Sequence, residues 1–226
     1  MQKREWSLAI SLITLSVNWL GYAMEQEIED YTMINRVYVS GKSGDVIIKS
    51  VDDLVDRCRV AHSSNIKPEE FYWQSFGTLC FYLKDIIAPI TIEIPSLYPI
   101  IKEVMVTSGN VCINGGCGAI KIEKHTGNVT LEPEYLNNTN VRVQNGNIVV
   151  HFPERVDATI EIYAKEGCVH NHMKRYAAMS KSFWNRDYLK IILDRGNHPV
   201  TISTKNGIVS LEENDDNTIN EEKINE

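Results

Sequence analysis

One short phrase recurs along this chain at nearly constant spacing: a small polar residue, glycine, usually asparagine, and then a β-branched residue that starts an apolar run. The clearest copies are 108–111, 126–129 and 145–148, with looser copies at 43–46, 166–169 and 206–209. The glycines at 109, 127, 146 and 167 are 18, 19 and 21 residues apart, and Gly207 follows 40 residues later. A fixed period near twenty residues, marked by turns, is typical of a stacked repeat.

The segments between these turns alternate apolar and β-branched residues with polar ones, which indicates half-buried strands. Glycine adopts positive φ without steric cost and asparagine tolerates the left-handed region, so the phrase allows a strand to restart in a new direction. We therefore predict an all-β, single-domain β-solenoid over 24–211, made of stacked coils of about 18–21 residues. The alternative is an antiparallel β-sandwich, in which such turns also join hairpins.

The N-terminus, residues 1–23, has the layout of a signal peptide. Lys3 and Arg4 precede a mostly apolar run at 8–20, which ends in the small residues Gly21 and Ala23. Cleavage after Ala23 would export the protein to the periplasm, the cell surface or the medium. An uncleaved anchor and a buried helix are the alternatives, and only the uncleaved segment would contact a membrane. The net charge of −7 argues against nucleic acid as a partner.

Two segments depart from the repeat. Over 171–188, large side chains recur at three- and four-residue steps, which predicts a helical insertion filling the missing coil between Gly167 and Gly207. Its aromatic residues Tyr176, Phe183 and Trp184 are candidate recognition residues, or alternatively they cap the open end of the solenoid. The last residues, 212–226, are dominated by Glu, Asp and Asn and predict a disordered acidic tail.

Candidate metal ligands lie at Cys168, His170 and His172. Residues two apart on a strand share a face, and zinc accepts thiolate and imidazole ligands. His125 from another coil could supply a fourth ligand, although polar residues at a strand end are the simpler reading. The five cysteines leave at least one unpaired. Cys112 could pair with Cys117 and Cys58 with Cys80, but spacing alone leaves free thiols equally open.

Catalytic motifs are absent from the sequence: it contains no nucleophile elbow, phosphate-binding loop or dinucleotide fingerprint. Glu123, Glu132 and Glu161 lie on or beside predicted strands, and paired carboxylates can cleave glycosides. However, exposed glutamates on strands are the usual solvated surface. We therefore expect a protein that is not an enzyme and needs no cofactor.

The run 89–95, the phrase at 106–111 and the turns at Gly127 and Gly146, taken in this order, resemble the bacterial putative-adhesin family of β-solenoid domains. Residues 152–162 are similar to the proline turn and following strand of that family, and the likeness covers about 34–211. The resemblance implies a β-solenoid outside the cytoplasmic membrane. It implies no catalytic residues.

These observations together predict an exported, non-enzymatic surface or periplasmic protein that acts as an adhesin-like binding or structural module. The outer strand faces that carry Lys121, Glu123, Arg142 and Glu161 are the expected contact surface for an unidentified macromolecule, together with the insertion. The open ends of the stack could also self-associate. The alternative function is a metal- or carbohydrate-acting enzyme that uses the Cys168, His170 and His172 cluster.

Overall fold

The computed structural model describes residues 26–54, 56–63, 72–84, 89–153, 156–173 and 188–213, and within these ranges every regular element is a strand. The expectation of an all-β protein is confirmed. The strands are β1 (Gln26–Thr32), β2 (Arg36–Ser43), β3 (Val46–Val51), β4 (Arg57–Ser63), β5 (Tyr72–Ser75), β6 (Thr78–Leu83), β7 (Ile90–Pro95), β8 (Ile101–Ser108), β9 (Val111–Asn114), β10 (Ala119–Thr126), β11 (Val129–Glu132), β12 (Asn137–Asn145), β13 (Ile148–Phe152), β14 (Ala158–Ala164), β15 (Cys168–Asn171), β16 (Tyr188–Leu193), β17 (His198–Asn206) and β18 (Ile208–Glu213).

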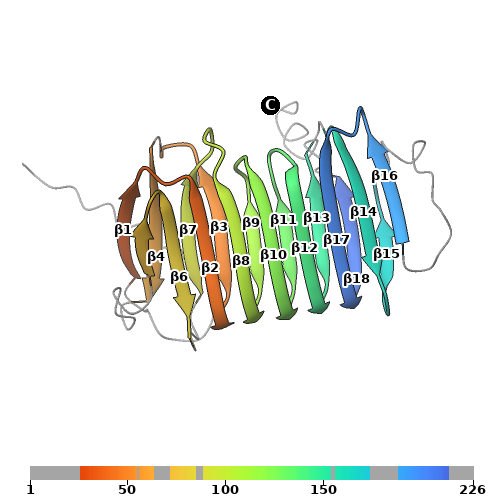
Figure 1. Ribbon diagram of the computed structural model, residues 1–226, viewed down its shortest axis with the longest axis horizontal. Coiled ribbons are helices and arrows are strands. Elements are labelled where there is room, and N and C mark those ends of the chain that lie inside the picture. Colours follow the sequence, from red (N-terminus) through yellow and green to blue (C-terminus); the bar gives the residue numbers. More distant parts are fainter. Residues whose placement is uncertain are drawn as a thin grey trace, which may run out of the picture.

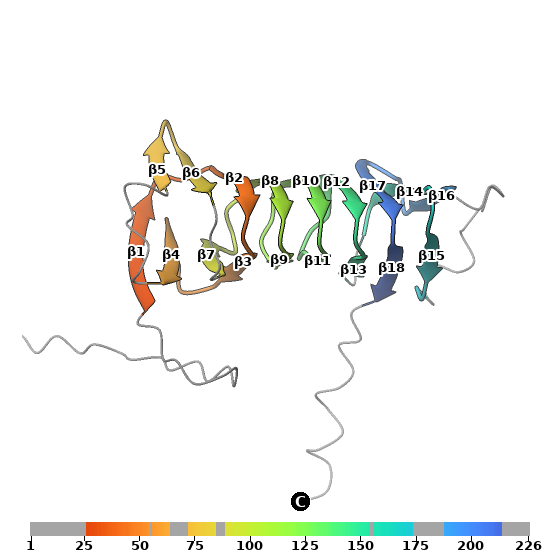
Figure 2. The same cartoon turned by 90° about the horizontal axis from the view of Figure 1, so that it is seen from below.

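The strands form two nine-stranded sheets that face each other (Figures 1 and 2). Sheet A has the order β1-β4-β7-β3-β9-β11-β13-β18-β15, and sheet B has the order β16-β14-β17-β12-β10-β8-β2-β6-β5. Every pair between β7 and β15 in sheet A, and between β14 and β6 in sheet B, is parallel. Antiparallel pairs occur only towards the ends, at β1–β4, β4–β7, β5–β6 and β14–β16.

The layering is that of a sandwich, but from β6 to β15 consecutive strands of the chain lie in opposite sheets. A strand of sheet B and the strand of sheet A that follows it are called a coil below. The coils are β2–β3, β6–β7, β8–β9, β10–β11, β12–β13, β14–β15 and β17–β18.

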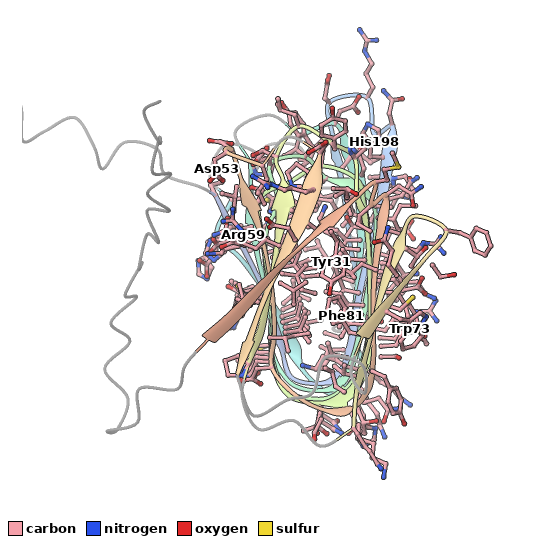
Figure 3. All side chains as sticks on the ribbon, turned by 90° about the vertical axis from the view of Figure 1, so that its left-hand side faces the viewer. Tyr31, Asp53, Arg59, Trp73, Phe81 and His198 are labelled. Atoms are coloured by element: carbon pink, nitrogen blue, oxygen red, sulfur yellow. The ribbon has the colours of Figure 1, made fainter. Side chains whose placement is uncertain are left out.

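The core is the space between the sheets, and it is filled by aliphatic side chains at alternate positions of each strand. Strand β10 is typical, because Ile120 and Ile122 are buried while Lys121 and Glu123 between them reach solvent. Equivalent Val, Ile and Leu residues stack from coil to coil into one cluster. Burying each such side chain contributes about 1.5–3 kcal/mol. At one end, β1 crosses the gap between the sheets, and Tyr31 packs against this cluster (Figure 3).

The recurring turn phrase forms two ladders at one edge of the stack. Gly127 has a φ of 114°, and a Cβ at this position would collide with the carbonyl oxygen of Gly109 in the neighbouring coil, so only glycine fits. The asparagines after the glycines join adjacent coils. The Asn110 Oδ1 accepts a hydrogen bond from the Asn128 amide at 3.1 Å, and the Asn128 Oδ1 accepts one from the Asn147 amide at 3.0 Å.

The order of the coils in space differs from their order in the sequence at both ends. The last coil, β17–β18, lies between β12–β13 and β14–β15, and the first coil, β2–β3, lies between β6–β7 and β8–β9. The sequence spacing suggests that one coil is missing between Gly167 and Gly207. This expectation is wrong, because Gly207 stacks directly between Gly146 and Gly167 and leaves no gap there. Each coil presents the same backbone ladder on both edges, so hydrogen bonding does not require the neighbour in space to be the neighbour in sequence.

The predicted N-terminal segment (1–23) lies outside the described residues, as do 174–187 of the predicted helical insertion and 214–226 of the predicted tail. Strand β15 ends at Asn171, β16 begins at Tyr188 and β18 continues to Glu213. Among the residues described, none forms a helix long and apolar enough to cross a membrane.

Candidate binding face

The outer face of sheet B is a broad surface on which side chains line up from strand to strand. Parallel pairing in register places equivalent residues side by side, with neighbouring strands about 4.8 Å apart. The face therefore carries three rows, which run across the strands. The first row contains Tyr38, Glu103, Lys121, Asn140, Thr201, Glu161 and Lys190; the second contains Tyr82, Ser40, Met105, Glu123, Arg142, Ser203, Tyr163 and Tyr188; the third contains Lys42, Thr107, His125, Gln144, Lys205 and Lys165.

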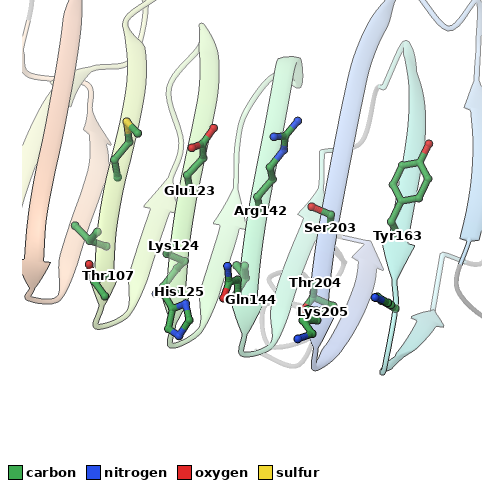
Figure 4. A pocket seen from close by; sticks show the side chains of 14 residues that line it. Thr107, Glu123, Lys124, His125, Arg142, Gln144, Tyr163, Ser203, Thr204 and Lys205 are labelled. Carbon is green, nitrogen blue, oxygen red and sulfur yellow. The ribbon is translucent and has the colours of Figure 1, made fainter.

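A shallow groove of about 770 Å³ lies over the second and third rows, and it crosses β8, β10, β12, β17 and β14 (Figure 4). Its lining combines cationic, anionic, hydroxyl, amide and aromatic groups. Because the lining comes from paired strands, the sheet itself fixes the spacing of these groups.

Charges in the first row are neutralised within the row or by the second row. The Lys121 Nζ lies 2.8 Å from Glu103 and 3.8 Å from Glu123, and the Lys190 Nζ lies 2.8 Å from Glu161. Hydrogen bonding to Glu103 raises the pKa of Lys121, and the hydrogen bond from Lys190 lowers the pKa of Glu161. These pairs are solvent-exposed, so each contributes little to stability.

Cations of the groove differ from those of the first row. Among the described residues, Arg142, Lys165 and Lys205 form no ion pair, and all three side chains are exposed. We call these three residues the basic strip. Beside them, the Lys124 side chain points inward, and its Nζ donates hydrogen bonds to the carbonyl oxygens of Gly109 and Asn128. Burial lowers the pKa of Lys124 to about 8.

An aromatic pair closes one end of the second row. The rings of Tyr163 and Tyr188 lie 4.9 Å apart, on the adjacent strands β14 and β16. The Tyr163 hydroxyl donates to Glu161 at 3.3 Å. Tyr163 is 43% exposed, so its side chain is accessible beside the basic strip.

The outer face of sheet A has a different charge pattern. Glu93 pairs with Lys49 at 2.9 Å and with Arg59 at 3.0 Å. Further along, His151 lies 3.6 Å from Glu132 and 3.5 Å from Glu212. On this face each of these three carboxylates has a cationic or imidazole side chain within 4 Å.

The predicted surface residues lie together on sheet B: Lys121 and Glu123 on β10, Arg142 on β12 and Glu161 on β14. Strand alternation was enough to identify them. The third row was missed. Its members share a signal in the sequence, because each one precedes a turn glycine by two positions. They are Lys42, Thr107, His125, Gln144, Lys165 and Lys205. The predicted recognition residues Tyr176, Phe183 and Trp184 lie outside the described residues.

The candidate metal ligands lie on and after β15 of sheet A, in the same coil as β14 but on the opposite sheet from the groove. The Cys168 Sγ is 3.4 Å from the His170 Nε2, and the rings of His170 and His172 are 6.1 Å apart. His125 lies on β10 of sheet B, on the opposite sheet. The described ranges contain no group of three or more His, Cys, Asp or Glu side chains placed to hold a metal ion.

The carboxylates considered for glycoside cleavage are not brought together. Glu123 on β10 and Glu161 on β14 are separated by three strand spacings, which is roughly 14 Å between their strands. Catalytic pairs lie about 5–9.5 Å apart. Glu132 lies on sheet A.

All five cysteines are free thiols. Cys58 on β4 and Cys80 on β6 belong to opposite sheets. Burial raises the pKa of Cys58 to about 12. Cys112 lies on β9, while the Cys117 Sγ donates to the carbonyl oxygen of Ser96 at 3.2 Å.

Comparison with known proteins gives structural likeness only. No family model matches the chain, and no curated protein matches it. A crystal structure described as a putative cell adhesion protein from Clostridium sporogenes matches with a TM-score of 0.51 at 12% identity, covering 84% of this chain and 99% of the other. A putative adhesin from Bacteroides fragilis matches with a TM-score of only 0.26, at 13% identity over 84% of this chain and 97% of the other. At this identity, the likeness to the Clostridium structure extends to the fold alone.

Proposed function

We propose that this protein is an exported, non-enzymatic, adhesin-like binding module, and that the groove over the second and third rows of the outer face of sheet B is its contact surface. The observation that carries the proposal is the groove on this face. It is built on paired strands, and it gathers cations, polar groups and an exposed tyrosine over five adjacent strands.

We further propose that the coils form a β-solenoid and not an antiparallel sandwich. In support, consecutive strands of each sheet are parallel and in register, as in the pairing of Ile122 with Val104 and Val141. An antiparallel sandwich would join neighbouring strands of one sheet by hairpins. A solenoid suits a binding module because each added coil extends the same flat face.

Export and adhesion have separate support. The charged, apolar and small-residue pattern of 1–23 is that of a signal peptide, and the matched Clostridium structure is described as a putative cell adhesion protein. The protein would act at the cell envelope or surface, as periplasmic, surface-bound or secreted material, and its partner would be a macromolecule of that compartment.

The test combines location with a blocked groove. The full chain, carrying a C-terminal epitope tag, is expressed in a bacterial host and followed by cell fractionation and by binding to a panel of immobilised polysaccharides and proteins. The variant Thr107→Trp/Gln144→Trp places two bulky rings in the groove, since both side chains are exposed there. The control Asn114→Trp adds a ring to the outer face of sheet A.

We expect the tagged chain outside the cytoplasm, and binding that is lost in the groove variant but kept in the control. Retention of the protein in the cytoplasm would overturn export. Equal binding by wild type and the groove variant would remove the groove from the proposal.

A further inference from the structure

The charges of the groove are unusual for an acidic chain. The whole protein has a net charge of −7, yet the outward side chains of the second and third rows within the groove include three cations and a single carboxylate, Glu123. In the first row every lysine has a carboxylate partner within 4 Å. The basic strip, Arg142, Lys165 and Lys205, therefore has cations available to a ligand.

The geometry of the strip suits an extended ligand. Arg142, Ser203 and Tyr163 lie side by side in the second row, on β12, β17 and β14. The lysines are two residues further along β17 and β14, and the Lys165 amide donates to the Thr204 carbonyl oxygen at 3.1 Å, which fixes the turn that carries this side chain. With neighbouring strands about 4.8 Å apart, the strip presents its charges over roughly 10 Å along the groove.

Other groups in the groove are neutral hydrogen-bonding partners. Thr107, Gln144 and Ser203 offer hydroxyl and amide groups, and Glu123 offers an acceptor for hydroxyl donors. Tyr163 adds an accessible aromatic side chain on which an apolar face of a sugar can pack.

We propose that the groove binds an acidic polysaccharide whose carboxylates contact the basic strip and whose hydroxyls contact the neutral groups beside it. This inference rests on the proposed binding function and specifies its ligand. The cations would position the polymer, and they would increase its association rate in a salt-dependent way. The remaining polar groups would provide selectivity for a hydroxylated chain.

Nucleic acid fits the same surface less well. Duplex DNA carries one charge per about 1.7 Å of its axis, and proteins that bind it use many phosphate contacts. Within the part of the chain that the structure describes, the groove offers three cations that form no ion pair. It also places Glu123 beside Arg142 and belongs to an acidic chain. A polymer with fewer charges and many hydroxyls matches this composition better.

The test uses the full chain and two polymers of similar length, polygalacturonate and uncharged dextran, with dissociation constants measured by calorimetry. The decisive variant is Lys165→Gln/Lys205→Gln. Its matched control is Lys121→Gln/Lys190→Gln, which removes the same charge from the same face, but at lysines that are already ion-paired. Thermal melting checks that both variants are folded.

We expect wild type to bind polygalacturonate and not dextran, and the decisive variant to weaken that binding by about tenfold, with less than about a twofold change in the control. Binding should also weaken as ionic strength rises from about 0.01 M to about 0.15 M, because the Debye length falls from about 30 Å to about 8 Å.

Other outcomes overturn the inference and separate it from the binding function. Equal affinity for dextran and polygalacturonate, lost on groove filling by Thr107→Trp/Gln144→Trp, would leave a binding groove for neutral glycans. Tighter binding to single-stranded DNA or to anionic lipid vesicles would assign the strip to another polyanion. Equal weakening in both lysine variants would reduce the effect to overall charge.

Discussion

The middle coils and the last coil have the same construction, but they differ in how far away in the sequence their neighbouring coils are. From β8 to β13, neighbouring coils are also neighbours in sequence, since Val129 pairs with Val111 and with Ile148, 18 and 19 positions away. In the last coil, Ile202 of β17 pairs with Val141, 61 positions earlier, and with Ile162, 40 positions earlier. The middle is thus held by local contacts, and the last coil by contacts that close long loops.

This difference indicates that the edge of a coil is a general docking surface. The same features recur where β18 meets β13: the glycine turn, the asparagine ladder and the aliphatic stack. In the ladder, the Asn147 Oδ1 accepts a hydrogen bond from the Ile208 amide at 3.0 Å. The last coil closes the stack by filling a place between two coils that precede it in the sequence.

The largest effect is expected from removing the last coil. Truncation after Leu193 removes β17 and β18. It leaves β12, β13 and β14 each with one strand neighbour in place of two, and β15 without its strand partner. It also deletes the buried side chains of Val200, Ile202, Val209 and Leu211. At about 1.5–3 kcal/mol for each side chain, this loss is comparable with the whole stability of a typical domain. We expect the truncated chain not to fold cooperatively, as measured by circular dichroism and urea titration.

Two matched variants show whether the loss is specific to the last coil. Truncation after Glu213 should leave the transition unchanged. Deletion of 110–127 removes β9 and β10, one repeat of 18 residues, and joins Gly109 to Asn128, so that β8 is followed by β11. This variant should still give a cooperatively folded protein, because the next coil offers the same edge. If this deletion abolished folding as completely as the truncation, the coils would not be interchangeable.

Glycine at the middle turns should be the next most sensitive position. Gly127→Val places a β-branched side chain at a φ of 114°, against the backbone of Gly109. Strain and overlap together should lower the free energy of unfolding by about 4 kcal/mol or more. At the end of sheet B, Gly77 also has a positive φ, of 74°, but an added Cβ there would come no closer than 3.1 Å to Asn35. Gly77→Ala should therefore cost only about 1–2 kcal/mol. Urea titration measures both, and equal costs would contradict the role of close stacking.

The sequence predicts one part of the fold and not another. The turn phrase and the strand alternation predict which residues face the core, because both depend on neighbours close in sequence, as at Ile120 to Glu123. The position of the last coil is not predictable in this way, since the edges of β13 and β15 accept β18 through the same backbone pattern as any other coil. Spacing in the sequence contains no information on which edge is filled.

The binding face is also predictable only in part. Lys121 and Arg142 could be identified as outward-facing from their strands. Whether such a lysine is neutralised depends on the strand that lies next to it, as Glu103 lies beside Lys121. Because β17 lies between β12 and β14, the row neighbours of Lys205 are Gln144 and Lys165, and it forms no ion pair with any described residue. The sequence therefore predicts the surface, but not which of its charges are unpaired.

A lysine at a core position is a further feature of the middle coils. Lys102 on β8 occupies a core position that pairs with Val37 and Ile120 in the neighbouring coils. Its Nζ donates to the Cys117 carbonyl oxygen at 2.8 Å. Burial lowers the pKa of Lys102 to about 8, although Cys117 and Glu134 nearby favour the charged form.

This shift predicts a dependence of stability on pH. Because the folded protein disfavours the ammonium form, the unfolded chain binds more protons between pH 8 and 10.5, and Lys102 makes stability rise with pH across this window. The rise from Lys102 is at most about 3.5 kcal/mol, at about 1.4 kcal/mol for each pKa unit. Burial also lowers the pKa of Lys124 to about 8, so Lys124 adds a rise over the same window. Lys102→Met should remove only the part that belongs to Lys102. Urea titrations of wild type and variant at matched pH isolate the effect from Cys58, whose raised pKa lowers stability above pH 9. If the stability of wild type and Lys102→Met changed with pH in the same way, the titration of Lys102 would not be the cause of the rise.

The smallest expected effects come from the asparagine ladder, and they compare the two regions directly. Asn128→Ala removes the acceptor for the Asn147 amide within the middle coils, and Asn147→Ala removes the acceptor for the Ile208 amide of the last coil. Each substitution should lower global stability by about 1 kcal/mol, because one exposed hydrogen bond is lost. Amide hydrogen exchange separates them. If the last coil opens as its own unit, Asn147→Ala should accelerate exchange across β17 and β18 through that opening and across β8 to β11 through global unfolding, whereas Asn128→Ala should accelerate exchange across β8 to β11 and leave β17 and β18 unchanged. Uniform acceleration in both variants would mean that the last coil unfolds only together with the rest of the stack.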